Sequence, residues 1–119
     1  MNTEFKPLVS IVIPTYNHAK FISKALKSVI DQTYKNWEAI IIDNESVDET
    51  YKLINNFNDS RIKYFKISND GVIAKSRNLG IKEAKGDWVA FLDSDDWWTK
   101  DKLEVCLSKI TKDVDFIYH

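Results

Sequence analysis

The feature that most constrains the fold is a regular alternation of short apolar runs with segments patterned as helices. The runs are rich in β-branched residues and predict five strands, namely LVSIVI (8–13), WEAIII (37–42), RIKYFKI (61–67), WVAFL (88–92) and VDFIY (114–118). The second and fourth are almost continuously apolar. Such strands are typical of a parallel sheet that is buried on both faces.

Between the runs, apolar residues recur at helical spacing and predict helices over 19–32, 47–57, 72–84 and 100–110. Ser46 followed by Glu49 has the pattern of a capping box at the second helix. Gly86 is expected to stop the third helix, and Thr99 to cap the fourth. The apolar residues of the third helix are Val72, Leu79, Ile81 and Ala84.

This β-α order predicts an α/β fold, with a Rossmann-like, open and mostly parallel sheet flanked by helices. The 119 residues are enough for one domain, which we place at 1–119. In such sheets ligands bind beyond the carboxyl ends of the strands, where the strand order reverses. Functional residues are therefore expected directly after each strand.

Composition excludes several classes of protein. The formal net charge of −1 argues against nucleic acid as a partner. Cys106 is the only cysteine and is expected to be a small buried residue on a helix. The N-terminus MNTEFKP has no apolar core, and no apolar run is long enough to span a bilayer. We therefore expect no transmembrane segment and a cytoplasmic location, possibly peripheral at the inner face of a membrane.

Polar segments follow the first four strands: PTYN (14–17), DNES (43–46), SNDG (68–71) and DSDD (93–96). The first has no glycine, so it is neither a dinucleotide-binding fingerprint nor a P-loop. A phosphate-bearing ligand bound here would need another source of charge neutralisation.

DSDD offers that source in one of its two interpretations. In an extended segment Asp93 and Asp95 would point the same way and could share a divalent cation, Mn²⁺ or Mg²⁺, with a diphosphate. The alternative is that these aspartates cap a helix or are merely solvated. Asp96 is expected to be structural, and Trp97 and Trp98 to be packing residues.

Other polar residues have a structural and a functional interpretation each. Asp43 is either a strand-end residue or a carboxylate that binds a base or ribose. Thr15 and Asn17 could satisfy loop backbone, and Arg77 could be solvated or could reach a phosphate. His18 and His119 are expected to be surface residues.

Two long blocks resemble the family 2 glycosyltransferases of the GT-A fold. They are VSIVIPTYNHAKFISKALKSVIDQTYKNWEAIIIDNESVDET and GVIAKSRNLGIKEAKGDWVAFLDSDDWW, and the match runs from Val9 to about Leu103. The resemblance implies transfer of a sugar from a nucleotide-diphosphate donor, typically a UDP-sugar, with inversion and a divalent metal. The acceptor would be a glycan or a lipid-linked glycan.

The resemblance also implies roles at matching positions. Pro14, Thr15, Tyr16 and Asn17 fall in the segment that contacts the nucleoside, and Asp43 matches the aspartate that binds the base. Arg77 matches an arginine that faces the nucleotide. Asp93 and Asp95 match the D-x-D pair: Asp95 would be the direct metal ligand, and Asp93 would lie near the ribose or the metal.

The chain departs from the family in two loops and in length. Asn44 and Glu45 stand where Asp-Gly is common, and Asp70 stands where glycine is frequent. Family members are about twice as long, and their later half supplies the catalytic base. We therefore expect that the base lies beyond residue 119, and that this chain is truncated, binds the donor and transfers little sugar alone.

Two rival functions remain. A receiver-type signalling module would need acidic residues after the first strand and a phosphoacceptor after the third, where this chain has PTYN and SNDG. A similar fold is a weak guide to function, and this chain lacks the acidic residues that a receiver module needs after its first strand. The second rival is a non-catalytic nucleotide-sugar-binding or interaction module.

Overall fold

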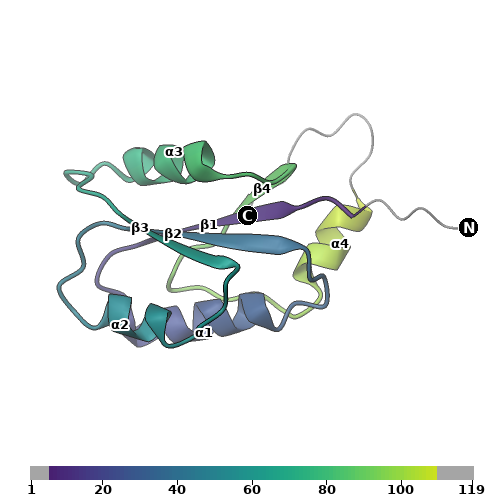
Figure 1. Ribbon diagram of the computed structural model, residues 1–119, viewed down its shortest axis with the longest axis horizontal. Coiled ribbons are helices and arrows are strands. Elements are labelled where there is room, and N and C mark those ends of the chain that lie inside the picture. Colours follow the sequence, from purple (N-terminus) through teal and green to yellow (C-terminus); the bar gives the residue numbers. More distant parts are fainter. Residues whose placement is uncertain (1–5, 110–119) are drawn as a thin grey trace, which may run out of the picture.

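The computed structural model describes residues 6–109. Within this range four strands alternate with four helices (Figure 1), in the order β1 (Val9–Thr15), α1 (Ala19–Ile30), β2 (Trp37–Asp43), α2 (Thr50–Asn55), β3 (Ile62–Lys66), α3 (Ile73–Glu83), β4 (Trp88–Phe91) and α4 (Lys102–Ser108). The predicted strand at 114–118 and His119 lie outside the described residues.

The described strands form one sheet in the order β3-β2-β1-β4, and every neighbouring pair is parallel. The chain builds outward from β1 to β3 and then returns to place β4 on the other side of β1. The strand order therefore reverses between β1 and β4, and this is where a ligand site is expected. The predicted α/β, Rossmann-like fold is confirmed.

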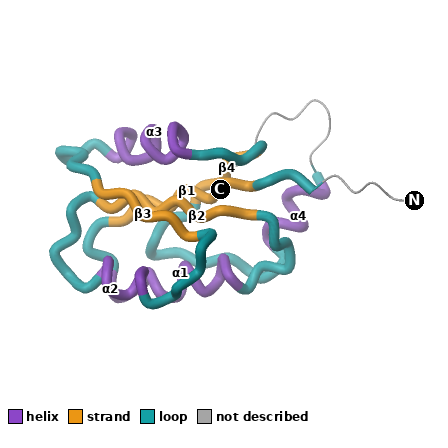
Figure 2. The backbone as a smooth tube through the Cα atoms, viewed as in Figure 1, coloured by secondary structure: helices purple, strands orange, loops and turns teal. Residues whose placement is uncertain are grey.

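Helices cover both faces of the sheet, as Figures 1 and 2 show. α1 and α2 lie on one face, and α3 lies on the other. The larger core packs α1 against the sheet through Ile22, Leu26 and Val29, with Trp98 and Leu103 added from the later chain. All seven residues of β2 are buried, which explains its continuous apolar sequence.

The predicted helix boundaries needed correction at both expected caps. Ser46 is not a cap, because α2 begins at Thr50, where Asp48 Oδ1 accepts the Thr50 N–H at 3.0 Å. Thr99 makes no side-chain cap either, since α4 begins at Lys102 after Asp101. Side-chain hydrogen bonds local to each turn therefore override the sequence pattern.

The third helix packs differently from the prediction. Its buried residues are Ser76 and Gly80, whereas Val72 and Ile81 are 45% and 49% exposed. A Cβ on Gly80 would lie 2.3 Å from Val12 Cγ1, so the absence of a side chain brings α3 close to the sheet. The predicted Leu79 and Ala84 do pack against Val12, Ile40 and Ile42, but the closest approach to the sheet is made by the small residues, which a search for apolar periodicity cannot detect.

The prediction that Gly86 stops α3 is wrong. The helix ends at Glu83, and Gly86 instead lies against β1, where a Cβ would be 2.6 Å from the Leu8 carbonyl oxygen. Its N–H donates to Ser10 Oγ at 2.8 Å. Glycine is needed here for the close approach of two backbones.

A buried polar network ties β1, β2, β3 and the chain before β4. Glu38 accepts hydrogen bonds from Ser10 Oγ at 2.6 Å, the Lys85 N–H at 2.7 Å and Lys63 Nζ at 3.1 Å. Burial raises the pKa of Glu38, but the hydrogen bonds from Ser10, Lys85 and Lys63 outweigh burial and leave the pKa lowered. The network holds a charged carboxylate inside the fold.

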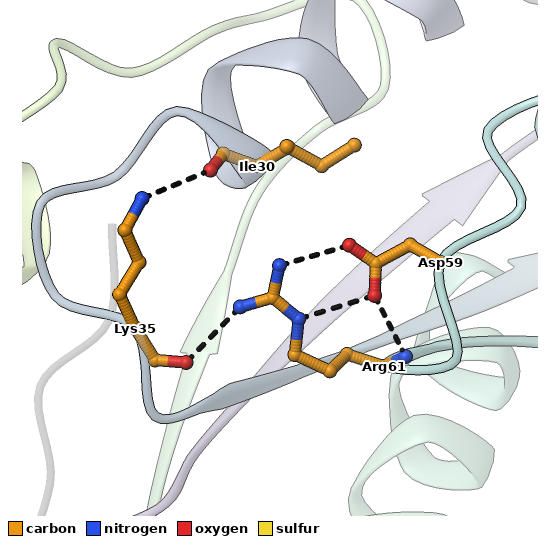
Figure 3. Close-up of polar contacts among 4 residues, drawn as sticks. All are labelled: Ile30, Lys35, Asp59 and Arg61. Atoms are coloured by element: carbon orange, nitrogen blue, oxygen red, sulfur yellow. Dashed lines mark hydrogen bonds and ion pairs between the residues drawn. The ribbon is translucent and has the colours of Figure 1, made fainter.

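A second polar cluster joins the loops before β2 and β3 (Figure 3). The Arg61 guanidinium donates to both Asp59 carboxylate oxygens, at 3.1 and 2.8 Å, and to the Lys35 carbonyl at 3.1 Å. The guanidinium also lies 3.8 Å from the centre of the Trp37 ring. The hydrogen bonds from Arg61 lower the pKa of Asp59. Both clusters stabilise the amino ends of the strands and leave the carboxyl ends available.

Candidate functional site

The carboxyl ends of β1 and β4 separate at the point where the strand order reverses. Pairing of β1 with β4 stops at Val12 and Phe91, whereas pairing of β1 with β2 continues to Thr15 and Asp43. Pro14 has no N–H to donate, and it lies in the part of β1 that has lost its β4 neighbour. The chain therefore leaves space on the β4 side of β1.

A cavity of about 950 Å³ occupies this edge of the sheet. Its size is within the range of small-molecule sites. The walls come from the segments that follow all four described strands, together with the start of α3, and consist of Pro14, Thr15, Tyr16, His18, Asn44, Glu45, Ser68, Asn69, Asp70, Gly71, Ile73, Ser76, Arg77, Asp93, Ser94 and Asp95.

Six of the eight residues predicted to form the site line this cavity: Pro14, Thr15, Tyr16, Arg77, Asp93 and Asp95. Asn17 and Asp43 do not belong to its lining. Tyr16 is 55% exposed, whereas Thr15 is 5% exposed and its Oγ1 has no hydrogen-bond partner among the described residues. Because Thr15 lines the cavity, a bound ligand could supply the hydrogen-bond partner that its buried hydroxyl lacks.

Asp43 is held from both sides of its carboxylate. Oδ1 accepts the Ser46 N–H at 3.0 Å and the Ser46 hydroxyl at 2.5 Å, and Oδ2 accepts the Tyr64 hydroxyl. Burial and this bond to Asp43 raise the pKa of Tyr64 well above its usual value. The carboxylate is 99% buried at the end of β2, next to Thr15, so its position is fixed by the fold.

The loops after β1 and β2 are joined by reciprocal hydrogen bonds. Ser46 Oγ accepts the Asn17 N–H at 2.8 Å, and Asn17 Oδ1 accepts the Val47 N–H at 2.8 Å. Asn17 therefore satisfies loop backbone, as its structural interpretation predicted. Asn44 extends the connection to the next loop, because its Oδ1 accepts the Asn69 N–H at 2.9 Å.

The positions where the chain departs from the family's glycines have left-handed backbone. Glu45 has φ 49° and Asp70 has φ 52°. Glycine adopts this region without steric cost, whereas a side chain with a Cβ does not. Both loops therefore have a backbone conformation suited to glycine, and Glu45 and Asp70 adopt it at a steric cost.

The DSDD segment is a turn and not an extended strand or a helix cap. The Asp96 N–H donates to the Asp93 carbonyl at 2.9 Å, and the nearest helix, α4, begins only at Lys102. Asp93 and Asp95 nevertheless both line the cavity, while Ser94 between them is 1% exposed. Asp96 is structural, since its Oδ1 accepts the Trp97 N–H at 2.8 Å.

The tryptophans after this turn have separate environments. Trp98 is 8% exposed and joins the core, as predicted. Trp97 is 50% exposed, and Lys24 Nζ lies 4.8 Å from its ring centre. The prediction that Trp97 is a packing residue is therefore wrong. Cys106, the only cysteine of the sequence, is half-buried on α4.

The carboxylates of the turn fit a hard divalent cation. Asp95 makes no hydrogen bond or ion pair with another described residue, and Arg77 Nη2 lies 3.9 Å from Asp93 Oδ1. Among residues 6–109 no group of three His, Cys, Asp or Glu could hold a metal ion by itself. Two carboxylates completed by ligand phosphates are a typical set for Mg²⁺ or Mn²⁺.

Sequence reasoning missed three residues of the site. His18, expected at the surface, is half-buried in the cavity wall, and its Nδ1 lies 2.5 Å from Ser94 Oγ. Asn69 and Ser76 are 4% and 2% exposed, and Asn69 Nδ2 donates to Ser76 Oγ at 2.9 Å. The position of Asn69 directly after a strand was the only available signal.

No helix in the described part of the chain is long and apolar enough to cross a membrane.

Comparison with known proteins gives a consistent family. The family described as "Glycosyl transferase family 2" matches residues 10–119. An uncharacterized glycosyltransferase of Rickettsia conorii is 47% identical over 92% of this chain, which spans 18% of that protein. UDP-Glc:alpha-D-GlcNAc-diphosphoundecaprenol beta-1,3-glucosyltransferase WfgD of Escherichia coli is 43% identical over 93% of this chain and 44% of its own length.

Solved structures give the same result. S. aureus TarS in complex with UDP-GlcNAc is 31% identical, with a TM-score of 0.80 over 84% of this chain and 30% of that one. A mannosyltransferase of Pyrobaculum calidifontis, in complex with GDP-Man and Mn²⁺, has a TM-score of 0.83 at 22% identity and covers 92% of this chain and 34% of its own. The latter shows likeness of fold. The chain thus spans less than half the length of each of these relatives.

Proposed function

The chain belongs to glycosyl transferase family 2, and from this premise we propose that its cavity binds the nucleotide-diphosphate sugar donor, a UDP-sugar, together with a divalent cation. The observation that carries the proposal is the meeting of Arg77, Asp93 and Asp95 with the Pro14–Tyr16 segment at one edge of the sheet. Additional support comes from TarS, whose structures include complexes with UDP and UDP-GlcNAc.

In this proposal each part of the donor is bound by different residues. Pro14, Thr15 and Tyr16 contact the nucleoside. Asp43 is the residue assigned to the base, but its carboxylate is buried outside the cavity lining. The base can reach the lone pair that Ser46 and Tyr64 leave unused only after the loop behind β2 moves. Asn17 contributes by fixing the loop. Arg77 neutralises the charge of the diphosphate from the α3 side. The turn after β1 has no glycine-rich loop of backbone N–H groups that could do this instead.

Asp95 and Asp93 would hold the metal on the β4 side. Asp95 is the direct ligand, because its carboxylate is exposed to the cavity and has no other partner among the described residues. Asp93 is shared between the cation and Arg77, whose Nη2 lies 3.9 Å away. A bound Mn²⁺ or Mg²⁺ supplies Lewis-acid stabilisation of the leaving diphosphate.

For the whole enzyme we propose inverting transfer to a glycan or lipid-linked acceptor. A base outside residues 1–119 removes the proton of an acceptor hydroxyl, whose oxygen bonds to the anomeric carbon while the bond to the diphosphate breaks. WfgD carries a glucosyltransferase name with a diphosphoundecaprenol acceptor, which supports this class of acceptor. The 119 residues alone are proposed to bind donor without transferring sugar.

Calorimetric titration with UDP, with and without Mn²⁺, tests the proposal. We expect Mn²⁺-dependent binding to the unmodified chain, loss of that dependence in Asp95→Ala, and unchanged binding in Asp31→Ala, a control that replaces an exposed aspartate away from the cavity. Absence of binding to any nucleoside diphosphate with metal present would contradict the proposal. Metal-dependent binding that survives Asp95→Ala would contradict the assignment of the ligand.

A further inference from the structure

The Asp93–Asp95 turn has an anchor from a distant part of the sequence. Ser94, the middle residue, is 1% exposed and points inward between the two exposed carboxylates. Its hydroxyl meets His18 Nδ1 at 2.5 Å, a contact between residues 76 positions apart. No other hydrogen bond of this hydroxyl occurs within residues 6–109.

The contact between Ser94 Oγ and His18 Nδ1 is one hydrogen bond whose direction follows the tautomer of the ring. Ser94 donates when the imidazole carries its proton on Nε2 and accepts when the proton is on Nδ1. In both cases the bond ties the middle of the turn to the start of α1, and its loss would leave a buried polar group without a partner.

His18 is itself held rigidly. Its carbonyl oxygen accepts the N–H groups of Phe21 and Ile22, both at 2.8 Å, and so begins the first turn of α1. Its ring meets the Phe21 ring edge-on, with centres 5.8 Å apart and planes at 90°. The next residue, Ala19, is tied by its N–H to Asp48 Oδ2 at 3.0 Å. A fixed backbone and a packed ring make His18 a firm support for Ser94.

We propose that His18 is a positioning residue, which holds the Ser94 hydroxyl and thereby fixes the turn that presents Asp93 and Asp95 to a divalent cation. The inference rests on the proposed function. It assigns to His18 no contact with the metal and no proton transfer. Partners outside the first shell of a metal site commonly decide how well its ligands are oriented.

The first test needs no metal. Amide hydrogen exchange of residues 93–97 should be faster by about fivefold or more in His18→Ala and Ser94→Ala than in the unmodified chain, because the turn loses its anchor. The amide of Asn can accept or donate at the position of Nδ1, so His18→Asn should exchange more slowly than His18→Ala. His18→Gln, whose amide reaches the Nε2 position, should not.

The second test measures Mn²⁺ affinity in the presence of UDP, by electron paramagnetic resonance of free Mn²⁺. His18→Ala and Ser94→Ala should each weaken Mn²⁺ binding about tenfold, and the double variant should be no worse than either. His18→Asn should retain affinity. The control is Lys20→Ala, which replaces an exposed residue in the first turn of α1, two positions from His18. Melting temperatures of all variants separate local effects from unfolding.

The outcomes distinguish this inference from the proposed function. Unchanged exchange and affinity in His18→Ala would overturn the inference and leave the proposed function standing. Faster exchange with unchanged Mn²⁺ affinity would also overturn it, since the anchor would not serve the metal. If the unmodified chain binds no Mn²⁺ with UDP, the proposed function fails and the positioning role fails with it, whatever the exchange data show.

Discussion

Arg77 Nη2 lies 3.9 Å from Asp93 Oδ1, so a cation on α3 faces the first carboxylate of the turn after β4. The side chains are 48% and 67% exposed, and an exposed pair of this kind contributes little to stability. Both residues line the cavity. The pair therefore adds little to the stability of the fold, and both side chains remain open to the cavity.

Replacing Arg77 should separate binding from stability. We predict that Arg77→Ala weakens UDP binding about tenfold or more, because a positive charge facing the diphosphate is lost. The melting temperature should stay within about 2 °C. Calorimetry and thermal melting measure the two quantities, with Lys82→Ala as an exposed control on the same helix. Normal UDP affinity of Arg77→Ala combined with a lowered melting temperature would contradict the assignment, because Arg77 would then serve the fold and not the ligand.

Glu45 should be replaceable with a gain in stability. Its φ of 49° costs a residue with a Cβ about 1 kcal/mol or more. Glu45→Gly is therefore predicted to raise the free energy of unfolding by up to about 1 kcal/mol, and Glu45→Ala to give no such gain. Urea denaturation measures both. Equal effects of the two variants would show that the backbone at this position is not strained.

Acid should destabilise the fold through Glu38. Its pKa is lowered in the folded state, so the unfolded state binds more protons as the pH falls. The stabilisation is present above the usual glutamate pKa of about 4.3 and is lost as the pH falls through the lower folded value. Asp59 and Asp48 also have lowered pKa values and act in the same direction.

Glu38→Gln tests this account of the acid sensitivity. At pH 7 it should lower the free energy of unfolding by about 1–3 kcal/mol, because the negative charge is lost and one of the two accepting oxygens becomes an NH₂ that faces other donors. Between about pH 5 and 3 its stability should fall less steeply than that of the unmodified chain. Urea denaturation across pH measures the slope. The exposed control Glu49→Gln should follow the unmodified chain, and a Glu38→Gln slope identical to both would refute the network.

The contact between α3 and β1 should tolerate no added methyl group. Gly80→Ala places a Cβ 2.3 Å from Val12 Cγ1 and is predicted to cost about 1–3 kcal/mol. Val12→Ala removes the clashing group, so the double variant should be more stable than the sum of the two single effects predicts. Denaturation of the four chains completes the cycle. Simple additivity would mean that the helix shifts away from Val12.

Local pattern predicted much of the fold, and long-range contacts account for most of what it missed. The run at 37–42 was recognised because a strand buried on both faces is continuously apolar. Gly80 and Ser76 escaped notice because a helix can dock through small residues that carry no apolar periodicity. The cap predicted at Ser46 failed because Asp43 and Asn17 already engage that side chain.

The site was predictable to the extent that strand ends meet at one edge of a parallel sheet. Pro14 and Asp95 could be placed together because each follows a predicted strand, whereas Arg77, inside α3, was assigned only through the family resemblance. His18 could not, because the residue that gives it a role, Ser94, is 76 positions away and itself looked like a spacer between aspartates. The turn conformation of Asp93–Asp96 was also hidden, since the sequence fits an extended segment equally well.

The central claim is that a nucleoside diphosphate binds at the carboxyl edge of the sheet, between β1 and β4. Amide chemical-shift mapping by NMR, with UDP and the diamagnetic Mg²⁺ added to the labelled chain, tests it most directly. We predict shifts concentrated at residues 15–18, 43–46, 69–77 and 93–95, with Ser10, Glu38 and Arg61 at the opposite end unaffected. Shifts centred on that opposite end, or no shifts at saturating UDP and Mg²⁺, would contradict the account.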